Sequence, residues 1–465
     1  MFDKILTQID NWVWGLPLII MILVVGIFLT IRVRGLQIRL LPRALKELFL
    51  NEKSGTDGEV SSFAALCTAL SATIGTGNIV GVATALVAGG PGALFWMWIA
   101  ALVGMATKYA ECLLAVKYRN VEEDGHIVGG PFYYIEKGMG PKWKWLAKIF
   151  AFFGVCVGLM GIGTFTQING ITNAVQNFFD PDKQWTVFLF GKEYSWTVVI
   201  AGIILTIAVA LVIIGGIQRI SSVSQVIVPF MAVLYVVFVL VLLLTHLSAI
   251  PSAIVEIVQS AFGMRPIAGG AVGSMIVAMQ KGIARGIFSN EAGLGSAPIA
   301  AAAAQTDSPG QQGLISMLGT FFDTIIICTM TGLAIVITGA WNVGLEGVAV
   351  TNKAFQDGLP ISGQVSAFVL MICLVFFAFT TILGWDYYSE RCLEYLIGGK
   401  QKVVKAYRWI YILAIFIGPF MTVSAVWTIA DIFNGLMAIP NLIALVALSG
   451  VIVSETKLYL ERIKR

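Results

Sequence analysis

Long apolar stretches alternate with short polar connections along this chain of 465 residues. Stretches of about twenty residues are long enough to cross a bilayer as helices. They are predicted near residues 13–31, 63–87, 93–116, 146–170, 197–214, 225–245, 267–289, 311–338, 363–385, 407–422 and 433–453. The alternating ten-residue segments of a β-barrel are absent from the sequence. The pattern therefore predicts an all-α membrane protein with eleven transmembrane helices in a single membrane domain.

The second predicted helix contains a block of weak helix formers near its middle, made of Gly75, Thr76, Gly77 and Asn78. A break there frees backbone N–H and C=O groups at membrane depth, which is tolerated only where protein or a polar cavity satisfies them. Residues 282–298 in the seventh helix and 379–385 in the ninth are similarly poor in helix formers. The alternative for the glycines is close helix packing without a break.

The two glycine-rich breaks, at Gly75 and Gly282, each fall in the first helix of a block of five. Because five is odd, the second block starts on the opposite side of the membrane. The layout predicts one leading helix and two inverted repeats, each with a broken first helix, as in secondary transporters. The predicted division is 1–62 for the leading helix and a basic cytoplasmic loop, 63–246 and 247–453 for the repeats, and 454–465 for a cytoplasmic tail.

Composition supports the membrane assignment, because only 12% of residues are charged and the mean hydropathy is +0.86, against about 25% charged in soluble domains. Of the 30 Lys and Arg residues, 22 fall in alternate connections and five in the others. The positive-inside rule then places the N-terminus outside and the C-terminus in the cytoplasm of a plasma membrane. Basic residues in this arrangement orient the protein and do not indicate nucleic-acid binding.

The sequence lacks the motifs that are typical of other functional classes. The sequence contains no acyltransferase, serine-hydrolase or HExxH zinc motif, so an enzyme is not predicted. The glycine-rich stretch 75–81 lacks the Lys-Ser/Thr end of a Walker motif, which argues against an ATP-driven pump. A proton-coupled transporter is the nearest alternative. The few carboxylates within spans, Glu111 and Asp323, favour sodium over protons.

Several segments together resemble the alanine or glycine:cation symporter family, which comprises the sodium:alanine symporters. They are 72–78, 89–98 continuing to Gly104, 288–298, 383–385 and 439–442. The resemblance runs from about residue 10 to residue 457. It implies a LeuT-like fold and sodium-coupled symport of small neutral amino acids by alternating access. Alanine and glycine are the expected substrates, with serine and glutamine left open. The expected partners are the substrate and the lipid bilayer, sodium is the coupling ion, no cofactor is expected, and the oligomeric state is undetermined.

A zwitterionic substrate requires donors for its carboxylate, acceptors for its ammonium and a pocket for its side chain. Backbone N–H groups of Thr76, Gly77 and Asn78 are expected to meet the carboxylate at a half-helix N-terminus, with Gly75 allowing close approach. The resemblance implies that Gln167 accepts from the ammonium and that Trp385 forms an aromatic wall of the pocket. Thr381 is a further substrate candidate, and Gln280 and Gly282 are candidates for the side-chain end. The alternatives are a helix–helix hydrogen bond for Gln167 and an interfacial anchor for Trp385.

Sodium prefers hard oxygen ligands, by extension from the chemistry of other hard cations. The resemblance implies a site made by the hydroxyls of Thr380 and Thr381 and the carbonyls of Ser71 and Ile74. Asn78 is the candidate for a second sodium site. The alternative for each threonine is a hydrogen bond to its own helix.

Charged residues within the spans are functional candidates by default. Lys108 and Glu111 lie three residues apart on one helix, which predicts an internal ion pair. Asp323 has no obvious partner in the sequence and is a candidate coupling residue. Lys281 and Arg285 are expected to pair with Glu291.

Overall fold

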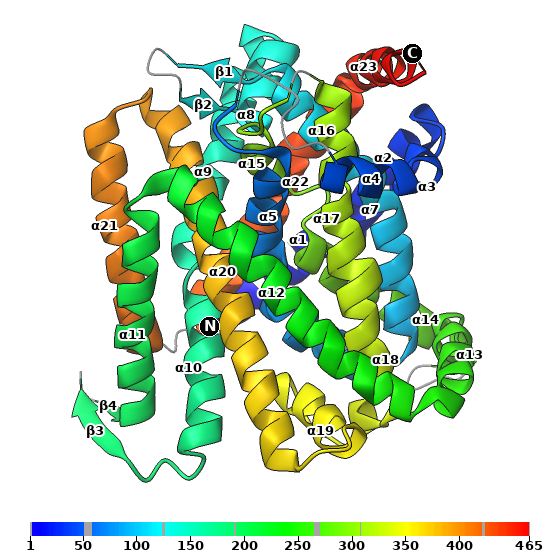
Figure 1. Cartoon of the computed structure of the whole chain (residues 1–465), viewed down its shortest axis with the longest axis vertical. Coiled ribbons are helices and arrows are strands. Elements are labelled where there is room, and N and C mark those ends of the chain that lie inside the picture. Colours follow the sequence, from blue (N-terminus) through cyan, green and yellow to red (C-terminus); the bar gives the residue numbers. More distant parts are fainter. Residues whose placement is uncertain are drawn as a thin grey trace.

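A computed structural model describes residues 2–50, 58–122, 126–189, 192–264, 270–306, 308–420 and 424–464, and nearly all of them are helical (Figure 1). The first half contains α1 (Phe2–Val13), α2 (Leu16–Arg32), α3 (Leu36–Arg39), α4 (Leu41–Leu50), α5 (Ser62–Thr73), α6 (Val82–Gly89), α7 (Gly92–Lys117), α8 (Pro131–Tyr133), α9 (Lys144–Met160), α10 (Phe165–Phe179), α11 (Trp196–Ile213) and α12 (Gly216–Thr245). The second half contains α13 (Ile250–Ala261), α14 (Gly270–Asn290), α15 (Ala297–Ala301), α16 (Pro309–Ser316), α17 (Leu318–Thr320), α18 (Thr329–Ile337), α19 (Val348–Gly358), α20 (Gly363–Ile397), α21 (Gln401–Ile417), α22 (Ser424–Ala447) and α23 (Ser449–Arg462).

In the part of the chain that the structure describes, the strands form two short antiparallel pairs. β1 (Asn120–Val121) pairs with β2 (Ile127–Val128), and β3 (Thr186–Leu189) pairs with β4 (Lys192–Ser195). Of the three π-helical segments described, η1 (Gly77–Gly81) and η5 (Phe321–Cys328) lie next to each other in the interior. The third is η2 (Tyr134–Gly138). The segments η3 (Pro141–Trp143), η4 (Leu247–Ala249), η6 (Ala340–Asn342) and η7 (Gly418–Phe420) are single turns between helices.

Among the described residues, nine helices are long and apolar enough to cross a membrane, and there are ten if the bent pair α5 and α6 counts as one span. The predicted span at 267–289 corresponds to α14, which is not among these ten. Its residues 267–269 lie outside the described part of the chain. The exact count of eleven stays a prediction.

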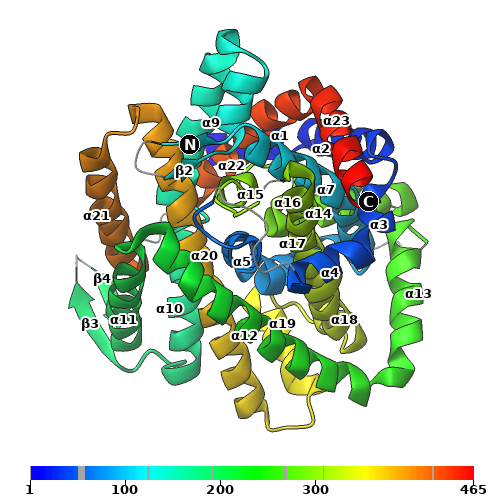
Figure 2. The ribbon, with the colours of Figure 1, turned by 45° about the horizontal axis from the view of Figure 1, so that its top comes forward.

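Hydropathy and burial run in opposite directions in α12 and α7. α12 has a mean hydropathy of 3.1 and is 33% buried, whereas α7 has a mean hydropathy of 1.5 and is 83% buried. A lipid-facing helix must be apolar on its outside, whereas an interior helix can present small and polar side chains to its neighbours. Figure 2 shows α5 near the middle of the bundle, with α12, α15, α17 and α20 around it. Other helices therefore surround the broken helix on most of its sides.

The break in the second predicted helix is confirmed. Ser61 caps α5 by accepting a hydrogen bond from the N–H of Ala64 at 3.1 Å, and α5 ends at Thr73. Ile74 is extended, and the next helical segment leaves at an angle of 52° to α5. The glycines at 75 and 77 allow this change of direction close to neighbouring helices.

The second break lies later than predicted. α14 runs without interruption through Gly282 and ends at Asn290, after which residues 291–296 form a non-helical connection to α15. Glu291, Gly293 and Gly295 have positive φ angles of 56°, 92° and 80° in this connection. The expectation of a break at Gly282 is therefore wrong, while a break in this first helix of the second predicted repeat is present eight residues further on.

Close packing explains why position 282 is a glycine. A side chain there would overlap the carbonyl oxygen of Ala93 on α7 and lie 2.9 Å from the Cβ of Trp96. Small residues let helices in a membrane approach each other closely. Gly282 therefore serves the contact between α7 and α14 and not a change of direction.

Replacing Gly282 with alanine is expected to destabilise the protein by about 2 kcal/mol, because a methyl group would push two tightly packed helices apart. Thermal unfolding of the purified variant in detergent measures the effect as a lower Tm. Gly286→Ala is the matched control, since its Cβ would contact the Cα of Met97 at an ordinary 3.4 Å. Equal Tm values for the two variants would contradict the packing role of Gly282.

Candidate functional site

The first break is held open by one buried asparagine. Asn78 accepts a hydrogen bond from the N–H of Gly75 through its Oδ1 at 2.8 Å, and its own N–H donates to the carbonyl of Gly75 at 3.3 Å. These two bonds close a tight loop around residues 75–78. The N–H groups of Thr76 and Gly77 come at the start of a helical segment, where intrahelical partners are missing. Of the three predicted carboxylate donors, the N–H of Asn78 is thus already used, whereas Thr76 and Gly77 keep the required position.

Asp323, on the π-helical η5, faces the same break. Its Oδ1 accepts from the Nδ2 of Asn78 at 2.6 Å and from the hydroxyl of Ser289 at 3.1 Å. Its Oδ2 accepts from the hydroxyl of Thr324 at 2.7 Å. Asp323, Asn78 and Thr324 are all fully buried. Asp323 therefore has several partners that the sequence did not indicate, and it joins η1, α14 and η5 in one polar cluster.

The cluster contains the kinds of oxygen atoms that bind a cation. The carboxylate of Asp323 and the hydroxyl of Ser289 converge here. Asn78 presents its Nδ2 to this carboxylate, while its Oδ1 accepts from the N–H of Gly75. A buried carboxylate with only neutral hydrogen-bond partners is costly, and a hard cation beside it offsets that cost. Ser289 was not identified from the sequence, although it lies inside the motif at 288–298.

A second group of oxygens forms where α20 crosses α5. The hydroxyl of Thr381 donates to the carbonyl of Phe377 at 2.9 Å and lies 3.5 Å from the carbonyl oxygen of Ile74. A side chain at Gly75 would overlap the hydroxyl of Thr381. One turn along α20, a Cβ at Gly384 would lie 2.8 Å from the hydroxyl of Ser71. The structure thus brings the carbonyl of Ile74 and the hydroxyl of Thr381 together. Ser71 lies nearby with its hydroxyl beside Gly384, while the predicted role of its carbonyl stays a prediction.

Thr380 points elsewhere. Its hydroxyl lies 3.5 Å from the sulfur of Met231 on α12 and donates to carbonyls of its own helix, those of Phe376 and Phe377. Adjacent residues on an α-helix are about 100° apart around the axis, so Thr380 and Thr381 cannot both face α5. The structure does not bring Thr380 to the carbonyl of Ile74.

Gln167 is a buried polar residue whose Oε1 has no hydrogen-bond partner among the described residues. It lies on α10, three residues before Gly170, where a Cβ would contact the methyl group of Thr76 at 3.0 Å. Residues three apart share a helix face. Gln167 therefore lies on the side of α10 that meets the first break, and its amide oxygen is an available acceptor. The alternative of a helix–helix hydrogen bond through this oxygen is not observed in the described chain.

Trp385 is fully buried, which is inconsistent with an interfacial anchor. Its indole N–H donates to Oε1 of Glu291 at 2.9 Å, and the hydroxyl of Ser296 donates to Oε2 at 2.5 Å. Trp385 also packs edge to face against Tyr388, with the ring centroids 5.6 Å apart. The second break is thus fixed to α20 through the carboxylate of Glu291.

The expected pairing of Glu291 with Lys281 and Arg285 is wrong, because Trp385 and Ser296 occupy its carboxylate. Lys281 and Arg285 instead line a small polar cavity with Asp10 and Asp431 from α1 and α22. Gln280 lines this cavity too, so the structure does not place it at the first break. Gly282 packs against α7 and is not at the break either.

Lys108 and Glu111 form no ion pair within the described structure, contrary to expectation. Oε1 of Glu111 accepts from the N–H of Gly293 at 3.1 Å and from the Nδ2 of Asn441 at 2.5 Å. The ammonium of Lys108 is buried and has no hydrogen-bond partner among the residues described. Glu111 on α7 therefore connects the second break, through Gly293, with Asn441 on α22.

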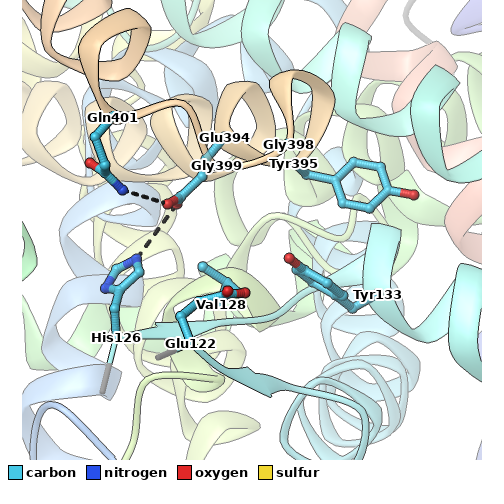
Figure 3. Close-up of a pocket in the computed structure, with 9 residues that line it drawn as sticks. All are labelled: Glu122, His126, Val128, Tyr133, Glu394, Tyr395, Gly398, Gly399 and Gln401. Atoms are coloured by element: carbon cyan, nitrogen blue, oxygen red, sulfur yellow. Dashed lines mark hydrogen bonds and ion pairs between the residues drawn. The ribbon is translucent and has the colours of Figure 1, made fainter. Parts of the chain in front are cut away.

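A polar cavity of about 500 Å³ lies at the loop end of α20 (Figure 3). His126, directly before β2, is 3.5 Å from the carboxylate of Glu394, and Gln401 donates to the same carboxylate at 3.1 Å. Arg391 pairs with Glu394 at 2.6 Å and also contacts His126. This network ties the hairpin to α20. The described residues that line this cavity do not include any residue of the first break.

Comparisons with known proteins agree with this architecture. The model of the sodium:alanine symporter family matches residues 1–465. An uncharacterized transporter of Haemophilus influenzae is 56% identical over 99% of this chain and 97% of its own. The sodium/alanine symporter AgcS of Methanococcus maripaludis is 47% identical over 99% of this chain and 98% of its own.

A solved structure shows a similar fold. The crystal structure of MhsT in complex with L-phenylalanine matches with a TM-score of 0.55 and 14% sequence identity. The match covers 87% of this chain and 99% of MhsT. MhsT is a LeuT-fold transporter, so the likeness confirms the LeuT-like fold expected from the sequence.

Proposed function

Because the chain belongs to the sodium:alanine symporter family, we propose that this membrane transporter couples the uptake of alanine to the inward movement of sodium. Glycine is the second proposed substrate. Serine and glutamine are larger candidate substrates for the same site. The substrate carboxylate would meet the N–H groups of Thr76 and Gly77, and its ammonium would donate to Oε1 of Gln167. Trp385 would close the pocket from α20.

The observation that supports sodium coupling is the group of oxygens around the first break. In the proposal one sodium ion binds between the carbonyls of Ser71 and Ile74 and the hydroxyl of Thr381. A second binds at Asn78 and Asp323, where the carboxylate supplies the opposite charge. Both proposed sites share the loop at 74–78, so the ions would order the same backbone that binds the substrate. This sharing gives a physical basis for coupled transport.

Alternating access would follow from the two inverted repeats, proposed as residues 63–246 and 247–453, with the breaks at 74–76 and 291–296 facing each other across the site. The excess of Lys and Arg in alternate connections supports an outside N-terminus and a cytoplasmic C-terminus in the plasma membrane.

Uptake of labelled alanine into proteoliposomes tests the proposal. An inward sodium gradient is expected to drive saturable accumulation, and replacing sodium with choline at fixed pH is expected to abolish it. Accumulation driven by a pH gradient without sodium would instead support the proton-coupled alternative. Competition by unlabelled glycine, serine and glutamine then ranks the substrates.

The two neighbouring threonines distinguish the first sodium site from ordinary helix packing. Thr381→Ala is expected to raise the sodium concentration for half-maximal uptake about tenfold, equivalent to about 1.4 kcal/mol of binding free energy. Thr380→Ala, the matched control, removes a hydroxyl that faces Met231 and is expected to leave the sodium requirement within about twofold. An equal effect of both substitutions, or none from Thr381→Ala, would contradict the proposed site.

A further inference from the structure

An apolar groove of about 410 Å³ lies on the outside of the bundle, between α12 and α5, with α4 at one end. Its rim is exposed: Val233 and Val237 on α12 are 62% and 50% exposed, and Phe49 on α4 is 70% exposed. The rim therefore faces the surroundings of the protein, which along the transmembrane helix α12 are the hydrocarbon of the bilayer.

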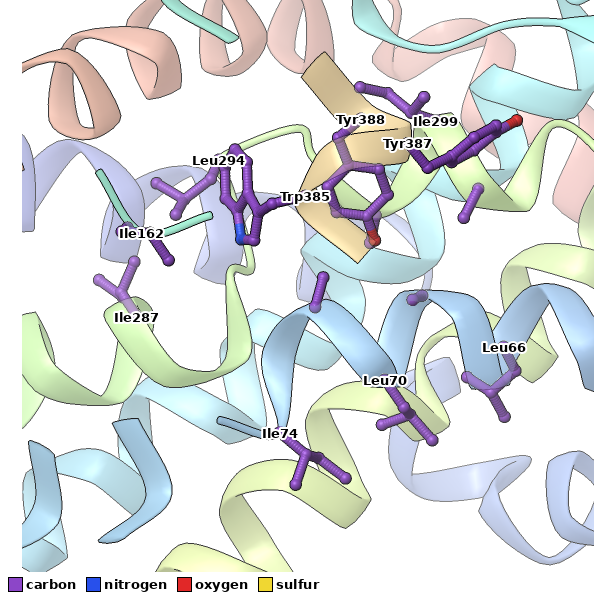
Figure 4. Packing of buried hydrophobic residues seen from close by; sticks show 14 of the residues in the cluster. Leu66, Leu70, Ile74, Ile162, Ile287, Leu294, Ile299, Trp385, Tyr387 and Tyr388 are labelled. Carbon is purple, nitrogen blue, oxygen red and sulfur yellow. The ribbon is translucent and has the colours of Figure 1, made fainter. Parts of the chain in front are cut away.

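The floor of the groove belongs to the broken helix. Leu66, Leu70 and Ile74 follow one another at intervals of four residues, and Figure 4 shows them pointing to the same side, away from Trp385. Phe322 of η5 lines the groove as well. One side of α5 thus supports the candidate site and the other side is the floor of the groove.

The dimensions of the groove correspond to one lipid leaflet. Its lining along α5 runs from Phe63 to Ile74, which is about 16 Å at the rise of an α-helix. That is about half of the hydrocarbon thickness of roughly 30 Å. Pro229 lies inside α12 on the groove wall, where it interrupts the hydrogen bonding of the helix and favours a bend.

A hydrocarbon chain is the occupant that this groove fits. An unfilled apolar space forfeits dispersion contacts on all of its sides, and a polar ligand would find almost no partner in this lining. Lipid tails are as apolar as the groove, so transfer from the bilayer brings no hydrophobic gain. Retention must therefore come from the close fit and from the headgroup.

The end of the groove at α4 offers a positive charge to a headgroup. Lys46 and Phe49 are three residues apart on α4, share a helix face and are both exposed. Of the two basic residues of α4, Arg43 is paired with Glu47 at 2.8 Å. Lys46 is therefore the basic residue of this described helix that can meet an anion. We propose that the groove binds a phospholipid, with an acyl chain along Leu66, Leu70 and Ile74 and the phosphate group near Lys46.

The bound chain would support the site from behind. The carbonyl of Ile74 lies 3.5 Å from the hydroxyl of Thr381, and Phe322 immediately precedes Asp323. A filled groove limits movement of these residues away from α20 and η1. The inference goes beyond the proposed function, because lipid binding does not depend on which amino acid or ion is transported.

Photo-crosslinking in proteoliposomes tests the proposal. The probe is phosphatidylglycerol with a diazirine on one acyl chain, and the labelled positions are mapped by peptide mass spectrometry. Labelling of residues 63–74 is expected to saturate as the mole fraction of the probe rises, whereas labelling of the lipid-facing Val226 is expected to rise in proportion. Proportional labelling at both places would mean bulk lipid only and would overturn the proposal.

Two variants extend the test. Ala232→Trp fills the groove from α12 and is expected to lower labelling of residues 63–74 at least fivefold, while Val226→Trp, on the same helix outside the groove, is expected to leave it unchanged. Lys46→Gln is expected to lower labelling by the same probe severalfold. Unchanged labelling in folded Ala232→Trp would overturn the acyl-chain site, and unchanged labelling in Lys46→Gln would overturn the headgroup contact. If Ala232→Trp does not fold, the saturation measurement on the wild-type protein still tests the proposal.

Discussion

Replacing Asp323 with asparagine is expected to lower sodium-driven alanine uptake about 100-fold. Asparagine keeps the shape of the side chain and can still bond to Asn78 and Ser289 after its amide turns, but it removes the negative charge. A unit charge about 4 Å from a cation is worth about 4 kcal/mol at the effective dielectric of partly buried sites. A loss of about 3 kcal/mol corresponds to the stated factor.

Initial rates of uptake across a sodium titration measure this effect. We expect the sodium concentration for half-maximal uptake to rise beyond the accessible range, with the protein still folded by size-exclusion chromatography. Asp357→Asn is the matched control: Asp357 is 42% exposed and pairs with Lys353 on the surface of α19, so wild-type uptake is expected. Wild-type sodium dependence in Asp323→Asn would show that its carboxylate has no part in coupling.

Replacing Gly75 with alanine is expected to abolish uptake, with a reduction of at least about 100-fold. A methyl group at this position would overlap the hydroxyl of Thr381 and lie 3.5 Å from its Cβ. Either α20 must move away from the break or Thr381 must turn its hydroxyl away from the carbonyl of Ile74. Both adjustments disturb the proposed sodium site, and small displacements of binding groups cost large factors in rate.

Gly81→Ala is the matched control for this substitution. Gly81 is also on the first broken helix, but nothing lies within 4 Å of a Cβ placed there. Wild-type uptake by Gly81→Ala beside an inactive, folded Gly75→Ala would tie the loss to the contact with Thr381. Comparable activity of the two variants would mean that the approach of α20 to the break is not needed for transport.

The hydrophobic pattern was sufficient to predict a helical membrane protein, and the weak helix formers were sufficient to predict the first break. Weak helix formers at 75–78 predicted a change of direction that the structure confirms, because glycine lowers helix stability wherever it stands. The same rule failed at Gly282, where α7 approaches so closely that only glycine fits. A sequence cannot separate these two uses of glycine, since the second depends on a helix almost two hundred residues away.

The hydrogen-bond partners of the buried polar residues likewise depend on tertiary packing more than on local sequence. The sequence identified Asn78, Thr381 and Asp323 as polar residues at membrane depth, where such residues are costly and usually functional. It paired Lys108 with Glu111 because they are neighbours on one helix. In the structure Glu111 instead bonds to Gly293 and Asn441, which are distant in sequence. Contacts within a helix follow from spacing, whereas contacts between helices follow from how the bundle packs.

The sequence by itself determined that this protein is a helical membrane transporter of the sodium:alanine symporter family with a break in its second helix. Those features depend on composition, on the length of apolar segments and on local motifs. Only the tertiary structure decided that Thr381 and not Thr380 faces the break, that Asp323 bonds to Asn78, and that the second break follows Asn290. The physical reason is that burial and hydrogen bonding between helices depend on which faces meet, and the bundle fixes those faces only when it packs.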